Sequence, residues 1–320
     1  LWFLLKRLGH PDTADGLVTV HLALFAVQAI LIGLVTVVAL LRASGRVRLP
    51  GDDLPTAPAR RRFLFDAAAV ALPAAAVAAG VGGVVETVSP VHLRRLRLPV
   101  ADLPGALHGL RILHLSDVHL WTLVTTDDLA RALRQVPRGS FDLVCVTGDL
   151  ADDMTQLPRG LELIADLDAP LGHFTCLGNH EHARGLREAL RAYAASDVSL
   201  LRASGRVLEH RGQPLVIAGI DDLRALPRTP QREFYPDQLR RALGPTDPAA
   251  FSLLLSHRPS VLPHAAAAGV DVVLAGHTHG GQLAIAGTSI LELNGATRWA
   301  WGVYREGSTT MHVTAGMGQW

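Results

Sequence analysis

The stretch LVCVTGDLAD at positions 143–152 decides how the sequence is interpreted. The apolar run Leu143–Thr147 leads without a break into Gly148 and Asp149. A short apolar run that ends at a turn residue is typical of a strand buried on both faces, as in a parallel sheet. We therefore expect Asp149 to present its carboxylate at the end of a buried strand.

Outward from this stretch, five further apolar runs have the same form, and most of them stop at residues with metal-binding side chains. The runs are Arg111–Leu115 before Asp117 and His119, Phe174–Leu177 before Asn179 and His180, Leu215–Ile220 before Asp221 and Asp222, Ser252–Leu255 before His257, and Val272–Ala275 before His277 and His279. For Asp221 and Asp222 we expect a turn or a helix cap rather than a ligand role.

Helical patterns separate several of these runs. One helical pattern begins at Thr126, and three others cover 158–167, 184–194 and 236–243. Alternating strands and helices predict an α/β fold. The tail contributes expected strands at 282–285, 289–293 and 310–314, which indicate a second sheet or an antiparallel edge.

The strand ends predict a binding site, because ligands bind beyond the carboxyl ends of parallel strands. Carboxylate, amide and imidazole groups without a thiolate suit Mn²⁺, Fe or Zn²⁺. Cys145 and Cys176 both lie inside apolar runs, where we expect small buried thiols.

In chain order, the motifs are Asp-x-His at 117–119, Gly-Asp-x-x-Asp at 148–152, Gly-Asn-His-Glu at 178–181, Ser-His at 256–257 and Gly-His-x-His at 276–279. This ordered set resembles the calcineurin-like metallophosphoesterase superfamily over about residues 92–318. It looks closest to the bacterial membrane-associated branch, with twin-arginine-exported phosphodiesterases and UDP-diacylglucosamine pyrophosphatase-like proteins. The resemblance implies a two-sheet α/β/β/α sandwich that holds two divalent metal ions.

The resemblance also implies roles for the strand-end residues. The first metal would take Asp117, His119, Asp149 and His279, and the second would take Asp149, Asn179, His257 and His277. Asp149 would bridge the metals, and His180 would assist attack of a metal-bridging hydroxide on a phosphodiester or pyrophosphate. Asp152 and Glu181 are expected behind the ligands. His182 and Arg184 lie just past the Gly-Asn-His-Glu motif, where we expect surface residues, with contact to the substrate as the alternative. Glu181 stands where many members of the superfamily have Asp.

The first 90 residues differ from the rest of the chain. Leu17–Leu41 contains no Asp, Glu, Lys or Arg, and about 20 apolar residues are enough to span a bilayer. A second, weaker apolar stretch covers Phe63–Val88, after an arginine-rich loop. We predict a membrane anchor over 1–90, with one or two transmembrane segments, and a metallophosphoesterase domain over 91–320.

The side of the membrane depends on the second stretch. The arginines between the two stretches mark a cytoplasmic loop. Arg61-Arg62-Phe63-Leu64 resembles a twin-arginine export signal. If Phe63–Val88 spans, the following domain lies outside the cytoplasm; if the stretch lies on the surface, the domain stays inside. We favour a bacterial cytoplasmic membrane with the catalytic domain outside.

Composition supports this division of the chain. Of 320 residues, 49% are hydrophobic and 18% are charged, against roughly a quarter charged in a globular domain. With 30 basic and 29 acidic residues and no basic stripe, nucleic acid is not an expected partner. The expected partners are a membrane and a phosphate-bearing substrate. Because the chain is predicted to be anchored in a membrane, a lipid-linked substrate is favoured.

Two other functions compete with hydrolysis. A non-catalytic metal-binding scaffold or sensor would not need the complete ligand set with His180. A transporter with an appended domain would be expected to bury charge in its spans, and Leu17–Leu41 has none. We also expect membrane spans before Leu1 and a further strand after Trp320.

Overall fold

The computed structural model describes residues 37, 91, 93–121, 124–226, 228–245, 250–281, 284–285, 288–289 and 297–317. The chain divides into two compact units, Leu1–Ser89 and Pro90–Trp320, and almost all described residues belong to the second. The predicted membrane segments at 17–41 and 63–88 lie outside the described residues, apart from Val37. Among the helices that are described, none is both long and apolar enough to cross a bilayer.

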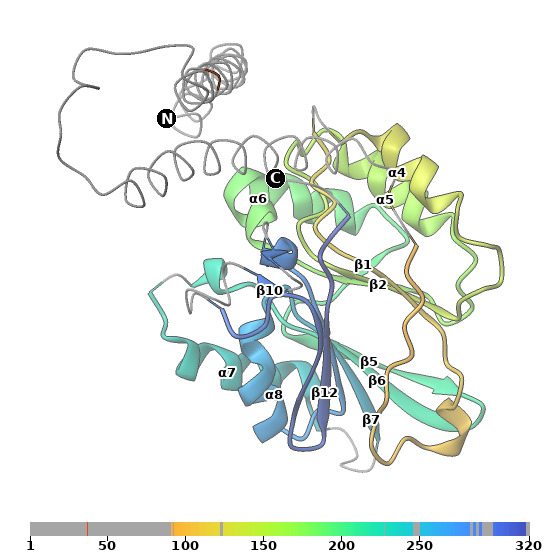
Figure 1. Cartoon of the computed structure of the whole chain (residues 1–320), viewed down its shortest axis with the longest axis vertical. Coiled ribbons are helices and arrows are strands. Elements are labelled where there is room, and N and C mark those ends of the chain that lie inside the picture. The colour runs from red at the N-terminus through yellow and green to blue at the C-terminus, as the bar shows by residue number, and fades with distance from the viewer. Residues whose placement is uncertain are drawn as a thin grey trace, which may run out of the picture. The chain divides into compact units, whose positions relative to one another are not determined.

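The first sheet is parallel, with the strand order β1-β2-β3-β4. Its strands are β1 (Ile112–Leu115), β2 (Leu143–Thr147), β3 (His173–Cys176) and β4 (Ser199–Leu200). Between them run α4 (Thr126–Leu133), α5 (Leu157–Ala165) and α6 (Asn179–Ala194), after a short 3₁₀ turn η1 (Gly105–Leu107). These yellow and green helices lie together against this sheet (Figure 1).

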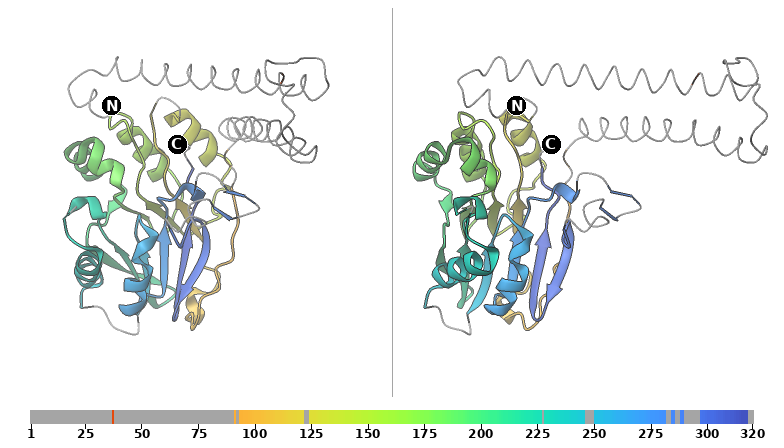
Figure 2. Two further views of the ribbon diagram at one scale, coloured as in Figure 1. Left: turned by 60° about the vertical axis from the view of Figure 1, so that its left-hand side comes forward. Right: turned by 90° about the vertical axis from the view of Figure 1, so that its left-hand side faces the viewer.

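The second sheet has the order β11-β12-β8-β7-β6-β5, with four parallel central strands and an antiparallel strand at each edge. Its strands are β5 (Ser204–His210), β6 (Gln213–Gly219), β7 (Phe251–Leu255), β8 (Val272–Ala275), β11 (Gly302–Glu306) and β12 (Thr309–Val313). Its helices α7 (Gln231–Leu243) and α8 (Leu262–Ala267) lie beside it (Figures 1 and 2).

Shorter elements complete the described chain. They are the 3₁₀ turns η2 (Leu223–Ala225), η3 (Pro259–Val261) and η4 (His279–Gly281), and the antiparallel pair β9 (Ala284–Ile285) and β10 (Thr288–Ser289).

Alternating side chains of the strands build three separate cores. In β2, Val144 and Val146 face α4, α5 and α6, whereas Leu143 and Cys145 face the other sheet. In β6, Leu215 and Ile217 face the first sheet, while Val216 and Ala218 pack against α7 and α8. One core therefore lies between the sheets and one lies under each helical layer. This is the predicted two-sheet α/β/β/α arrangement.

Several boundaries differ from the sequence prediction. Helix α6 begins at Asn179 rather than at residue 184, so the Gly-Asn-His-Glu motif forms its first turn. Its start is fixed by Glu181, which accepts a hydrogen bond from the backbone N–H of Gly178 at 2.8 Å. Strands β5 and β11 were not predicted, because both lie at sheet edges and carry mixed polar and apolar side chains.

Candidate metal centre

Five strands from the two sheets deliver metal-type side chains to one place. β1, β2 and β3 come from the first sheet, and β7 and β8 from the second. We call the following residues, each just beyond a strand end, the strand-end cluster: Asp117, His119, Asp149, Asn179, His257, His277 and His279. β1, β2 and β3 run parallel to one another, and so do β7 and β8, so the carboxyl ends of these five strands meet at one edge of their sheets.

The loops after β1 and β2 are held against each other by backbone hydrogen bonds. The N–H groups of Asp117, His119 and Leu120 donate to the carbonyl groups of Gly148, Asp149 and Leu150 at 3.0–3.1 Å. This ladder extends the strand pairing past the strand ends. It fixes the separation of two carboxylates that the sequence places 32 residues apart.

Backbone strain is concentrated in the same cluster. Asp117, His119, Asp149, His277 and His279 all have positive φ, between 48° and 74°. A non-glycine residue in this region costs on the order of 1 kcal/mol or more, and it persists only where its surroundings impose it. Such strain is typical of a functional site, because it aims side chains in directions that regular backbone does not allow.

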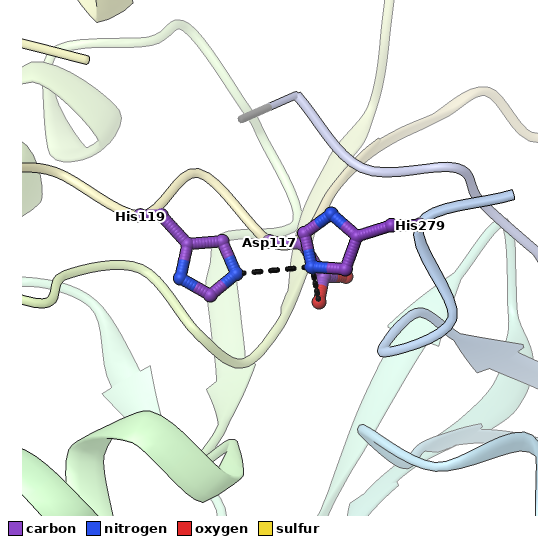
Figure 3. A group of neighbouring side chains, drawn as sticks. All are labelled: Asp117, His119 and His279. Carbon is purple, nitrogen blue, oxygen red and sulfur yellow. Dashed lines mark hydrogen bonds and ion pairs between the residues drawn. The ribbon is translucent and has the colours of Figure 1, made fainter. Parts of the chain in front are cut away.

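Asp117, His119 and His279 form one group (Figure 3). The Nε2 atoms of His119 and His279 lie 3.1 Å apart, and His279 Nε2 lies 3.4 Å from Asp117 Oδ1. Asp117 is buried and also accepts the backbone N–H of His277 at 2.9 Å. The three ligand-type atoms therefore face a common point.

Asp149, His257 and His277 form a second group, to which Asn179 is adjacent. His257 Nε2 lies 3.2 Å from Asp149 Oδ2, 3.2 Å from Asn179 Oδ1 and 3.0 Å from His277 Nδ1. Asp149 Oδ2 also lies 3.8 Å from His119 Nε2. Asp149 thus stands between the two groups, as the bridging role requires.

His180 lies beside the cluster in a histidine–aspartate pair. Its Nδ1 contacts Asp152 Oδ1, and its Nε2 lies 3.9 Å from Asp149 Oδ2. Its backbone N–H donates to Asp149 Oδ1 at 2.8 Å. Asp152 also contacts His119 Nδ1, at 3.4 Å. One carboxylate therefore orients both imidazole rings and leaves each Nε2 facing the cluster.

The donor set fits divalent metal ions. Metal–nitrogen bonds of about 2.0–2.1 Å in a tetrahedral site put neighbouring ligand atoms about 3.3 Å apart, close to the 3.0–3.4 Å contacts within the two groups. His257 Nδ1 donates to the carbonyl of Thr147 at 2.8 Å, which leaves Nε2 as the coordinating atom. A second hydrogen bond of this kind is the usual partner of a metal-bound imidazole.

Burial and charge shift the protonation of this cluster. Burial opposes charge on His257, but Asp149, assisted by Asp117 and Asp222, outweighs it and raises the pKa of His257 to about 10. Burial also opposes charge on Asp149, yet the imidazoles of His257, His180 and His119 hold the pKa of Asp149 well below its usual range. The protein without metal therefore holds a proton on His257, whereas burial and the neighbouring charges of His257 and Arg258 keep the pKa of His277 well below its usual range.

The side chains of the remaining predicted residues are largely buried, so the surface positions expected for His182 and Arg184 were wrong. The fully buried carboxylate of Glu181 accepts the backbone N–H groups of Gly178, Asp149 and Leu150 at 2.7–3.1 Å, so it ties two loops together. His182 Nε2 lies 2.6 Å from Asp221 Oδ1. Arg184 Nε lies 3.4 Å from Asp152 Oδ1.

Arg258 and Asp222 also belong to this site, although the pattern of strand ends assigned neither of them to it. Arg258, directly after His257, contacts both His277 and Asn179 through its guanidinium. Asp222 caps η2, as expected, by accepting the N–H of Arg224 at 2.8 Å, but it also binds Arg258. The signal that the sequence offered for Arg258 was its positive charge directly after the predicted ligand His257.

Metal binding should release protons. At pH 8, His257 is protonated because its pKa is about 10, and coordination needs the neutral ring. We expect at least one proton released per chain, and metal affinity that rises with pH toward pH 10. Calorimetric titration of Mn²⁺ in buffers of different protonation enthalpy measures this release. Heats that do not depend on the buffer at pH 8 would contradict it.

Gly178 should tolerate no side chain. An added Cβ would lie 2.1 Å from Asp149 Oδ1 and 2.5 Å from Asp149 N. We expect Gly178→Ala to lower the free energy of unfolding of the metal-free protein by about 1–3 kcal/mol and to weaken metal binding. Chemical denaturation and calorimetry measure these two effects. Gly105→Ala is the matched control, because its Cβ would meet nothing within 4 Å.

Comparison with known proteins agrees with this geometry. Residues 110–281 match the sequence profile of the calcineurin-like phosphoesterase family. An uncharacterized metallophosphoesterase of Aquifex aeolicus is 36% identical over 58% of this chain and 68% of its own length. A transmembrane protein with a metallophosphoesterase domain from Danio rerio is 30% identical, over 74% of this chain but only 55% of its own length.

A third relative has a named activity. The UDP-2,3-diacylglucosamine pyrophosphatase LpxG of Chlamydia trachomatis is 28% identical over 67% of this chain and 79% of its own length. The match to the family profile covers more than half of the 320 residues and includes every member of the strand-end cluster. The chain therefore belongs to the calcineurin-like phosphoesterase family, a family of phosphoester hydrolases.

Proposed function

We propose that the chain is a membrane-anchored hydrolase that uses two divalent metal ions to cleave a phosphodiester or a pyrophosphate carried on a lipid. One observation carries the catalytic part of this proposal. Seven metal-type side chains from five strand ends lie at ligand spacing, with Asp149 between the two groups.

Charge balance supports a phosphate-bearing substrate. Two divalent ions would bring four positive charges, and Asp117 and Asp149 would neutralise two of them. The other five members of the strand-end cluster are neutral amide or imidazole groups when they coordinate. The site would therefore keep a positive surplus that attracts a phosphate anion. Bound metals of this kind polarise the phosphoryl group and activate water at neutral pH.

The protein's own residues would position and protonate the substrate. With Nδ1 of His180 paired to Asp152, the other ring nitrogen, Nε2, faces the cluster and can carry a proton. There it can protonate the leaving oxygen or hydrogen-bond to a phosphoryl oxygen. The presence of this pair favours an enzyme over a non-catalytic scaffold, because a metal-binding scaffold has no use for a positioned proton donor.

The membrane and lipid parts of the proposal rest on different support. Leu17–Leu41 is uncharged and long enough to span a bilayer. One relative is a transmembrane protein, and another acts on a diacylated nucleotide sugar. We propose an extracytoplasmic catalytic domain, as the twin-arginine-like motif before Phe63 suggests. Reporter fusions after residues 55 and 90 test this orientation: opposite locations support it, and two cytoplasmic reporters refute it.

Hydrolysis itself is tested on the purified full chain in detergent. We expect bis(p-nitrophenyl) phosphate to be cleaved with Mn²⁺, Fe²⁺ or Zn²⁺ and to be untouched after chelation. Metal analysis should give two ions per chain. A panel of lipid phosphodiesters and nucleotide-linked lipids then ranks the substrates by kcat/KM. No turnover on any of these esters by the metal-loaded protein would overturn the proposed function.

A further inference from the structure

Arg258 extends across the second group of the strand-end cluster. Its Nε donates to Asp222 Oδ2 at 2.6 Å, and its Nη2 lies 3.3 Å from Asp222 Oδ1. The terminal nitrogens of the guanidinium reach the cluster, with Nη1 2.7 Å from His277 Nε2 and Nη2 3.3 Å from Asn179 Oδ1. The Asp222 side chain is fully buried, whereas 26% of the Arg258 side chain is exposed. A buried carboxylate thus holds a guanidinium that remains open to solvent.

The contact with His277 cannot persist once His277 coordinates a metal through Nδ1. His277 Nδ1 faces His257, at 3.0 Å from its Nε2, so Nδ1 is the atom turned toward the second group. A neutral imidazole that coordinates through one nitrogen carries its proton on the other. Arginine has only donors. Nη1 of Arg258 and a protonated Nε2 of His277 would be two donors facing each other, so the guanidinium must turn away.

Arg258 can stay bound to Asp222 when its guanidinium turns away from His277. The guanidinium is planar and turns as one unit. Its bond from Nε to Asp222 does not involve His277, so Asp222 can keep the guanidinium beside the second group after the contact with His277 is lost. Nη1 and Nη2, on a side chain that is 26% exposed, would then offer N–H groups to a ligand beside the second group. Planar guanidinium donors match the oxygens of a phosphate in a two-point hydrogen bond.

We propose that Arg258 forms an anion subsite beside the second metal position, where it binds a non-bridging phosphoryl oxygen of the substrate or a free phosphate. This role rests on the proposed function, since it assumes that a phosphoester is turned over at the strand-end cluster. It adds to that function a residue for substrate recognition that coordinates no metal. Asp222 is its positioning partner.

The test measures binding of inorganic phosphate to the Mn²⁺-loaded full chain by calorimetry, alongside metal content. We expect Arg258→Gln to weaken phosphate binding at least tenfold, and Arg258→Lys to restore only part of it because lysine lacks the fork. Arg111→Gln is the matched control, because Arg111 makes a similar pair with Asp142 but at the opposite end of β1. We expect its phosphate binding to equal that of the unmodified chain.

The second readout is the binding of Mn²⁺. It shows whether Arg258 recognises phosphate or instead helps to hold the metal ligands in place. Arg258→Gln should bind its second equivalent of Mn²⁺ at least as tightly as the unmodified chain, because no guanidinium has to leave His277. Loss of that equivalent, or phosphate binding by Arg258→Gln within twofold of the unmodified chain, would overturn the subsite. Failure of the proposed function gives a different result: phosphate binding that depends on Arg258, without turnover of any ester.

Discussion

Asp149→Asn should reduce phosphoester hydrolysis by about 10³-fold or more and lower the metal content from two ions per chain to one or none. Asp149 Oδ2 lies 3.2 Å from His257 Nε2 and 3.8 Å from His119 Nε2, so this one oxygen serves both groups. Asparagine keeps the volume but removes the charge that both cations would share. Metal activation is worth several kcal/mol of barrier, and each 1.36 kcal/mol is tenfold in rate. Steady-state kinetics and elemental analysis measure the two losses.

The variant also has a signature that does not depend on turnover. Because Asp149 raises the pKa of His257 to about 10, Asp149→Asn should bring the pKa of that imidazole down in the metal-free protein, as seen by NMR titration. Asp142→Asn is the matched control, since Asp142 pairs with Arg111 at the surface and should leave activity unchanged. Activity of Asp149→Asn within tenfold of the unmodified chain would refute the bridging role.

The strand-end residues could be placed from the sequence because buried parallel strands have a simple signature. Leu143–Thr147 and Val272–Ala275 were predicted with their observed boundaries, since strands buried on both faces read as uninterrupted apolar runs. The turn residue after each run then marks the sheet edge where ligands gather. Edge strands such as β5 lack this signal, because one side of the strand faces solvent.

The packing of one sheet against the other could not be predicted from the sequence. The link between β7 and the first sheet runs through His257 and the Thr147 carbonyl, 110 residues away. Similarly, Asp222 was expected to form a turn or a helix cap, which involves only local neighbours, whereas its second partner Arg258 comes from another strand end. Contacts that depend on how the two sheets pack leave no pattern along the chain.

His180→Gln should lower kcat by about 10²–10⁴-fold while the two metals stay bound and KM changes little. Loss of a positioned proton donor is worth this much, and His180 lies next to the ligands rather than among the seven cluster residues. His180 Nδ1 is held by Asp152, so its Nε2 is the atom that acts. His108→Gln is the control, because His108 is exposed and bonded to the Leu103 carbonyl.

The leaving group decides which of two roles His180 has. A general acid matters most when the departing oxygen is basic, so His180→Gln should impair an alkyl phosphodiester far more than a nitrophenyl ester. If His180 instead stabilises charge on the phosphoryl oxygens, both esters should slow by the same factor. Metal content must be checked in each preparation, because His180 donates its backbone N–H to Asp149. Unchanged kcat on both esters would remove His180 from the mechanism and leave catalysis to the metal cluster alone.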